Sequence, residues 1–138
     1  MKLQLRWLMV SLTVAAACLT SFVARAEALR QTPLNEPIQL SGLAGGEQTS
    51  SCGYLPATPD QVLQVTEEFT SLDIQVQGEG DLTLFIEGDN GFSECLTMDR
   101  FSEGTIQAPG LLNQGTYSIY VGSQSTAQPS YTLSIEQR

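Results

Sequence analysis

Histidine is absent from the chain, and its single lysine and single tryptophan, Lys2 and Trp7, both stand in the first seven residues. Without histidine, Ser-His-Asp and Cys-His catalysis and histidine metal ligation are excluded. If the first 26 residues are removed, the loss of lysine also excludes Schiff bases, a Ser-Lys pair and a P-loop. Only carboxylate chemistry remains, and the 15 acidic residues show no spacing that specifies a glycosidase pair. We therefore predict a protein that is not an enzyme, with a carboxylate-based hydrolase as the remaining alternative.

The beginning of the chain has the pattern of a signal peptide. Lys2 and Arg6 precede an apolar run at residues 7–17, and Ala24 and Ala26 occupy the −3 and −1 positions of a cleavage site. The run is shorter than the roughly 18 to 20 residues of a membrane span, so we predict a removed leader at 1–26 and no retained span. The three alanines before Cys18 loosely resemble a lipobox, but its usual leucine is missing, and we expect no lipid anchor there.

The chain that remains after cleavage is strongly acidic. Removing 26 of the 138 residues leaves 112, which is the size of one domain. Arg30, Arg100 and Arg138 then stand against 15 acidic residues, a net charge of −12. Such a field repels nucleic acid and anionic lipid and favours cations or basic surfaces. We expect a periplasmic or extracellular location and a partner that is a protein or another envelope component.

Hydrophobic residues alternate with polar ones along most of the chain from Leu34 onward. This period of two is typical of strands with one buried face, and no segment of ten residues has a convincing amphipathic helical pattern. Gly-rich turns separate the runs at short intervals. We predict an all-β antiparallel sandwich, jelly-roll-like, with seven to eight strands in a single domain at 37–138, preceded by a flexible arm at 27–36. The clearest strands are 72–76, 82–86, 117–121 and 131–135.

Two cysteines, Cys52 and Cys95, lie in the predicted domain. In an oxidising compartment an even pair is most simply a disulfide, and it would hold the Gly-, Ser- and Pro-rich connection at 44–59 against a strand. The alternative is two separate buried thiols.

The order of strands and turns resembles a known family. Gly80-Asp81-Leu82-Thr83-Leu84 is followed by the turn Gly88-Asp89-Asn90-Gly91, then by Gly115-Thr116-Tyr117 with Val121-Gly122, and by Tyr131-Thr132-Leu133-Ser134-Ile135. Over about Leu34 to Glu136 this is similar to the bacterial pre-peptidase C-terminal domain, a secreted β-sandwich. The resemblance implies an accessory domain that helps bind substrate or is removed in maturation, here without an attached enzyme, and some relatives bind calcium.

Two sets of residues are candidates for a binding site. Asp81, Asp89, Asn90 and Asp99 lie near turns and offer the oxygen ligands that calcium prefers, although Arg100 would oppose a cation and solvated turn carboxylates are the alternative. Phe85 and Tyr120 fall on the opposite face from the apolar residues of their strands, where they could form an exposed patch for a partner or the second side of strands buried on both faces. We predict a non-catalytic binding or structural module of unknown ligand and no cofactor, with a calcium-dependent adhesion or stabilising domain as the alternative.

Overall fold

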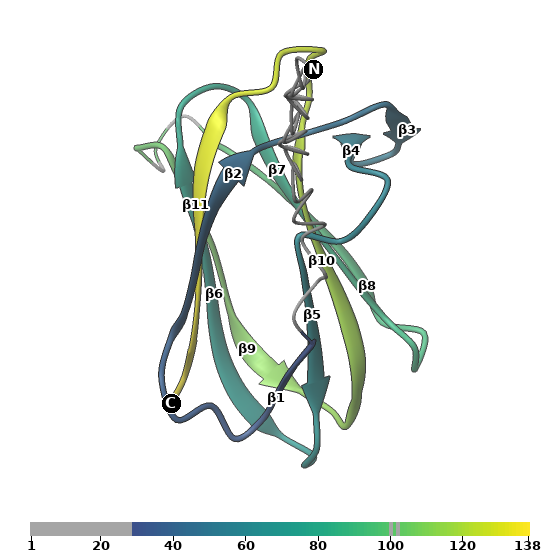
Figure 1. The fold of residues 1–138 in the computed structure, drawn as a ribbon, viewed down its shortest axis with the longest axis vertical. Coiled ribbons are helices and arrows are strands. Elements are labelled where there is room, and N and C mark those ends of the chain that lie inside the picture. The colour runs from purple at the N-terminus through teal and green to yellow at the C-terminus, as the bar shows by residue number, and fades with distance from the viewer. Residues whose placement is uncertain (1–28, 100, 102) are drawn as a thin grey trace, which may run out of the picture.

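A computed structural model describes residues 29–99, 101 and 103–138, and this part of the chain is built from β-strands, without a helix. No helix in that part is therefore long and apolar enough to cross a membrane. The strands form two sheets that pack face to face as a sandwich (Figure 1). The eleven strands are β1 (Leu29–Gln31), β2 (Ile38–Leu43), β3 (Gln48–Ser50), β4 (Gly53–Leu55), β5 (Gln61–Val65), β6 (Thr70–Gly78), β7 (Leu82–Gly88), β8 (Ser93–Thr97), β9 (Thr105–Leu112), β10 (Gly115–Ser123) and β11 (Ser130–Gln137). The predicted all-β sandwich is confirmed, but the described residues form eleven strands rather than the predicted seven to eight, and β1 pairs in parallel.

The larger sheet has seven strands and is organised around β10. One edge of β10 pairs antiparallel with β7, which in turn pairs with β8. Its other edge pairs with β5 and, further along, with β4. Short β1 lies parallel to β5, and β3 forms a hairpin with β4. The smaller sheet has the order β2-β11-β6-β9, and all of its pairs are antiparallel.

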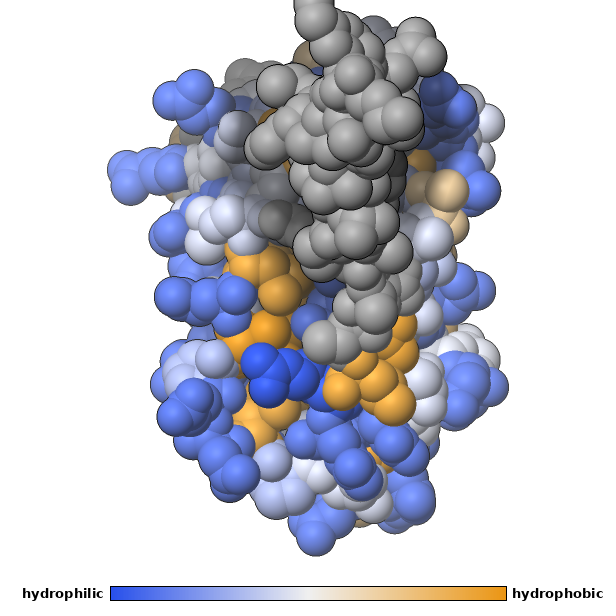
Figure 2. Space-filling model, viewed as in Figure 1, coloured by the Kyte–Doolittle hydropathy of each residue, from blue (hydrophilic) through white to orange (hydrophobic). Residues whose placement is uncertain are grey.

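Alternation along the strands sorts side chains between the core and the surface. On β6, for example, Leu72, Ile74 and Val76 are at most 2% exposed, while the residues between them are only partly buried. Burying one such aliphatic side chain stabilises the fold by about 1.5–3 kcal/mol relative to leaving it in water. In Figure 2, hydrophilic residues surround a strip of apolar residues between the two sheets. Strands β6, β7, β10 and β11 supply most of the core: Leu72, Ile74, Val76, Leu82, Leu84, Ile86, Tyr117, Ile119, Val121, Tyr131, Leu133 and Ile135.

A polar contact joins the two sheets at the margin of this core. The hydroxyl of Tyr131, on β11, donates to Oδ1 of Asp60, just before β5, at 2.7 Å. Oδ2 of Asp60 accepts from the backbone N–H of Val121, on β10, also at 2.7 Å. One carboxylate therefore links a strand of the smaller sheet to the central strand of the larger one.

The predicted disulfide between Cys52 and Cys95 is confirmed, with their Cα atoms 5.7 Å apart. Cys52 lies in the turn of the β3–β4 hairpin, and Cys95 lies on β8. The hairpin occupies much of the segment 44–59, which was expected to be an irregular connection. The disulfide and a hydrogen bond from Thr83 Oγ1 to Cys52 O fix this hairpin against β7 and β8.

The segment 27–36 differs from the flexible arm that was predicted. Residues 29–31 pair with β5, and buried Thr32 accepts from the backbone N–H of Thr66 through Oγ1. A backbone hydrogen bond from Thr32 N to Gln64 O extends the pairing. These bonds hold the segment from Leu29 onward against the larger sheet. The predicted leader at 1–26 and Cys18 lie outside the described residues.

Candidate functional site

The four predicted calcium ligands are divided between the two ends of β7. Asp81 precedes β7, and Asp89 and Asn90 follow it, eight or nine residues later and so about 26 Å away for an extended strand. Asp99 follows β8 and returns to the end where Asp81 lies, because Met98 N donates to Leu82 O. Throughout the described residues, no three acidic or cysteine side chains gather as a group that could hold a metal ion. The structure therefore does not bring the four residues together.

Asp89 and Asn90 instead stabilise the turn after β7. Oδ1 of Asp89 accepts from Thr116 N at 3.0 Å, and Asn90 Nδ2 donates to the Tyr117 hydroxyl at 2.9 Å. Oδ1 of Asn90 accepts from Phe92 N at 3.1 Å. These bonds tie the β7–β8 turn to the start of β10. They give both side chains a structural role without an ion.

Phe85 and Tyr120 are cross-strand neighbours on the outer face of the larger sheet. Their ring centroids lie 5.9 Å apart and the rings are tilted by 37°. Both side chains are half-buried, and Phe85 is also opposite Cys95 of the disulfide. The two residues therefore share the outer face, as their alternation predicted, and form a half-buried aromatic pair there, while their role in binding stays a prediction.

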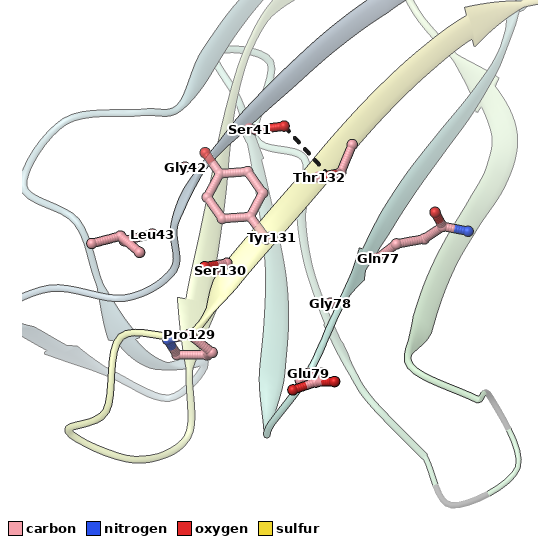
Figure 3. A pocket seen from close by; sticks show the side chains of 10 residues that line it. All are labelled: Ser41, Gly42, Leu43, Gln77, Gly78, Glu79, Pro129, Ser130, Tyr131 and Thr132. Atoms are coloured by element: carbon pink, nitrogen blue, oxygen red, sulfur yellow. Dashed lines mark hydrogen bonds between the residues drawn. The ribbon is translucent and has the colours of Figure 1, made fainter.

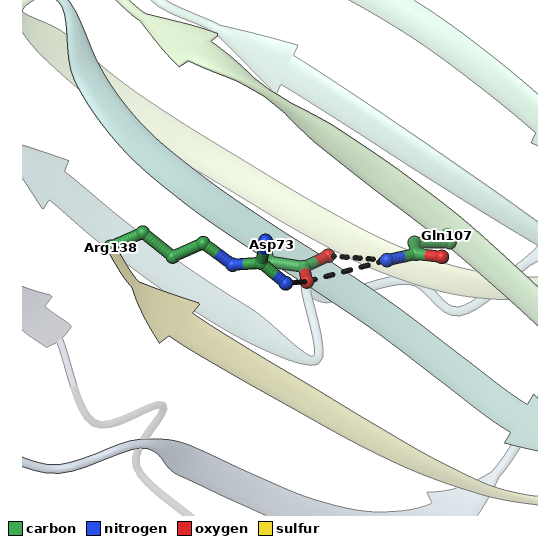
Figure 4. A network of polar contacts seen from close by, with 3 residues as sticks. All are labelled: Asp73, Gln107 and Arg138. Carbon is green, nitrogen blue, oxygen red and sulfur yellow. Dashed lines mark hydrogen bonds and ion pairs between the residues drawn. The ribbon is translucent and has the colours of Figure 1, made fainter.

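The outer face of the smaller sheet is polar. Arg138 Nη2 lies 2.7 Å from Oδ2 of Asp73, and Gln107 Nε2 donates to both oxygens of that carboxylate (Figure 4). Near the opposite end of this sheet is an open depression of about 860 Å³. In Figure 3 the side chains of Leu43, Gln77 and Glu79 point away from one another, and Ser41 and Thr132 bond to each other. Neither feature presents convergent groups that would orient a ligand.

A groove at the other end of the sandwich has more of the properties of a binding site. It lies where the β5–β6, β7–β8 and β9–β10 connections meet, at the lower end of Figure 1, and has a volume of about 740 Å³. We call it the end groove. Its lining residues are Glu68, Phe69, Asn90, Gly91, Phe92, Leu111, Leu112, Asn113, Gln114 and Tyr117.

Phe69 is the unusual residue of the end groove. Its φ is 57°, in the left-handed region that a bulky side chain rarely adopts, and it is 70% exposed. Leu111 on β9 is 63% exposed and lines the same groove. The ring of Phe92 packs edge-on against buried Tyr117 in the same groove, with centroids 5.7 Å apart. The end groove thus combines two exposed apolar side chains with an aromatic pair.

Sequence reasoning missed the end groove because its residues come from three separate connections and from the strand ends beside them. Phe69 and Leu111 are 42 positions apart and neither belongs to a clear alternating run. The available signal was a phenylalanine directly before a strand, in the polar context Glu67-Glu68-Phe69-Thr70, where a turn residue would be expected.

Comparison with known proteins places the chain in a family. It is 30% identical over 140 residues to an uncharacterized protein of Synechococcus elongatus, in a match that spans 97% of this chain and all of that protein. The chain belongs to the same family as this cyanobacterial protein. No protein-family model matches the chain.

Solved structures confirm the resemblance in fold. The pre-peptidase C-terminal domain of a collagenase from Bacillus anthracis superposes with a TM-score of 0.50, over 81% of this chain and 98% of that domain, at 22% identity. The chain therefore has the fold of a pre-peptidase C-terminal domain. A periplasmic inhibitor of g-type lysozyme from Aeromonas hydrophila gives a TM-score of 0.45 at 12% identity, over 80% of this chain and 97% of the inhibitor.

Proposed function

We propose that the protein is an exported, non-catalytic binding module that holds another protein through the end groove. The observation that carries this proposal is Phe69, an aromatic side chain held 70% exposed on left-handed backbone beside exposed Leu111. Backbone strain of this kind persists where the surrounding structure imposes it, and it gathers at ligand-binding sites. An exposed aromatic and an exposed leucine beside an aromatic pair match the centre of a protein–protein contact, with a polar rim from Asn90 and Gln114.

Export and the lack of catalysis are supported by separate observations. The first 26 residues read as a leader, and the Cys52–Cys95 disulfide is typical of an oxidising compartment. The chain has no histidine, and the carboxylates of its described part do not gather into a group of three. The end groove itself contains a single carboxylate, Glu68, where hydrolysis of a glycoside requires two.

Site-specific photocrosslinking in the producing cell tests this function. The photoreactive residue p-benzoylphenylalanine is introduced singly at positions 69 and 111 in the groove, at 85 on the outer face of the larger sheet, and at 39. Gln39 is an exposed residue of β2 on the smaller sheet and serves as the control. We expect the same discrete protein adduct from positions 69 and 111 and none from position 39. Adducts from position 85 alone, or no difference among the four positions, would refute the end groove as the binding surface.

A further inference from the structure

The side of the sandwich next to the end groove is formed by two edge strands. Within the described residues β8 pairs with β7 alone and β9 pairs with β6 alone, so each strand has one edge without a strand partner. β8, from the larger sheet, contacts β9, from the smaller sheet. Four of the five residues of β8 are exposed. We call this side of the molecule the open side.

Three depressions follow one another along the open side. The first is the end groove, which shares Phe92, Leu111 and Leu112 with a small apolar cavity of about 100 Å³ between Ile86 and Ala108. A third depression, of about 310 Å³, lies further along between Leu96 on β8 and Ile106 on β9. The series thus runs beside β8 from its beginning to beyond its end.

Each depression is lined by one carboxylate. These are Glu68 in the end groove, Glu94 in the small cavity and Asp99 in the third depression. No arginine or lysine lines any of the three in the part of the chain that the structure describes. Arg138 is paired with Asp73 on the outer face of the smaller sheet, and Arg30 lies on β1. The open side therefore combines apolar side chains with the negative charge of Glu68 and Glu94.

An edge strand that carries neither proline nor lysine is open to pairing with another chain. β8 has neither, whereas β9 carries Pro109. Pairing of β8 with β8 of a second copy would bring together two strongly acidic molecules, which repel each other. A segment with lysine or arginine beside apolar side chains has the complementary charge.

We propose that an extended, cationic segment of the partner protein adds as a strand to the free edge of β8. Because Glu94 lies opposite Ile86, on the face of β8 that lines the depressions, the side chains of the added strand on that face are of both kinds. The apolar ones enter the depressions, and the lysines or arginines lie beside Glu68 and Glu94. This inference rests on the proposed function, because the end groove is the first of the three depressions. Main-chain hydrogen bonds to β8 supply affinity in such a complex, and the side chains supply specificity.

Nuclear magnetic resonance with a defined peptide tests the inference. The probe is a ten-residue peptide with valine and lysine in turn at its odd positions, which share one face of a strand, and with threonine at its even positions. It is titrated into the ¹⁵N-labelled mature protein. We expect shift changes confined to β8, β9 and the end groove, slower amide exchange in β8, and weaker binding at raised salt. A peptide with glutamate in place of lysine should not bind.

Matched variants and peptides separate strand addition from general charge attraction. Glu68→Gln and Glu94→Gln should each weaken binding about threefold, as expected for a partly exposed ion pair. Glu87→Gln, an exposed residue on the outer face of β7, should have no effect. N-methylation of alternate amides of the peptide, in one of its two registers, should abolish binding because those amides can no longer donate to β8. Equal binding of both methylated peptides, or equal effects of Glu87→Gln and Glu94→Gln, would refute the inference.

The end groove and strand addition can each be refuted without refuting the other. An adduct at position 69 without peptide binding at β8 would refute strand addition and retain the end groove. Peptide binding at β8 with no adduct at position 69 would refute the end groove as the surface that holds the cellular partner.

Discussion

Phe69 gives the most direct test of whether the end groove serves binding or stability. Replacing it with asparagine removes the aromatic ring but keeps a residue that tolerates left-handed backbone. Replacing it with alanine removes the ring and retains the backbone strain. The two variants therefore separate the contribution of the side chain from that of the backbone.

The expected energies follow from the exposure and the backbone angle of this residue. A phenylalanine buries roughly 200 Å² at most, so Phe69, which is 70% exposed, buries about 60 Å², worth about 1.5 kcal/mol at ~25 cal/mol per Å². Its φ of 57° costs about 1–2 kcal/mol. Phe69→Asn loses the burial energy of the ring but relieves the backbone strain, so it should change the free energy of unfolding by less than about 1 kcal/mol. Phe69→Ala should lose about 1 kcal/mol more than the asparagine variant.

Urea unfolding of the purified mature variants, with linear extrapolation to water, measures both differences. The asparagine variant should unfold near the wild-type midpoint and lose partner crosslinking from a photoreactive residue at position 111. A loss above about 2 kcal/mol would show that Phe69 is a packing residue, and the argument from exposure would fail. Equal stability of Phe69→Asn and Phe69→Ala would show that the backbone contributes no strain.

Three further predictions concern stability. Replacing both Cys52 and Cys95 with alanine opens a loop of sequence separation 43, and chain entropy predicts a loss of about 4 kcal/mol in urea unfolding; dithiothreitol should destabilise the wild type but not the double variant. Tyr131→Phe removes the 2.7 Å hydrogen bond to the Asp60 carboxylate and should cost about 1.5–3 kcal/mol in the same assay, a prediction that an unchanged midpoint would contradict. A calcium chelator should leave the thermal midpoint unchanged, because the four predicted ligands lie at opposite ends of β7; a fall of several degrees would require a calcium site.

The sequence predicted the sandwich because its central strands are consistently half-buried. Where one face of a strand is fully covered, as on β6, β7, β10 and β11, the period of two appears directly in the residues. The number of strands was harder to predict than the fold class. β1, β3 and β4 have three residues each, which is too short for alternation to be visible, and tertiary pairing rather than local pattern makes them strands.

The sites were predicted less well, for a geometric reason. Asp81 and Asp89 are close in sequence, yet a strand extends between them and separates them. Phe69 and Leu111 are distant in sequence, yet the β5–β6 connection and the end of β9 lie at the same end of the sandwich and bring them to one groove. Proximity of this kind depends on strand order, which the hydrophobic pattern does not specify.

The position of β11 has a consequence for how the chain acquires its structure. β11 lies between β2 and β6, so the smaller sheet is divided until residues 130–137 have arrived. A chain made from its N-terminus presents β2 and β6 long before the strand that joins them, and both have bare edges during that interval. Pairing of such distant segments is slow. Until the last strand is inserted, the bare edges of one incomplete chain are therefore open to pairing with those of another. If a premature stop removed Ser130 and the residues after it, β2 and β6 would keep their bare edges, and the product would be prone to proteolysis and aggregation.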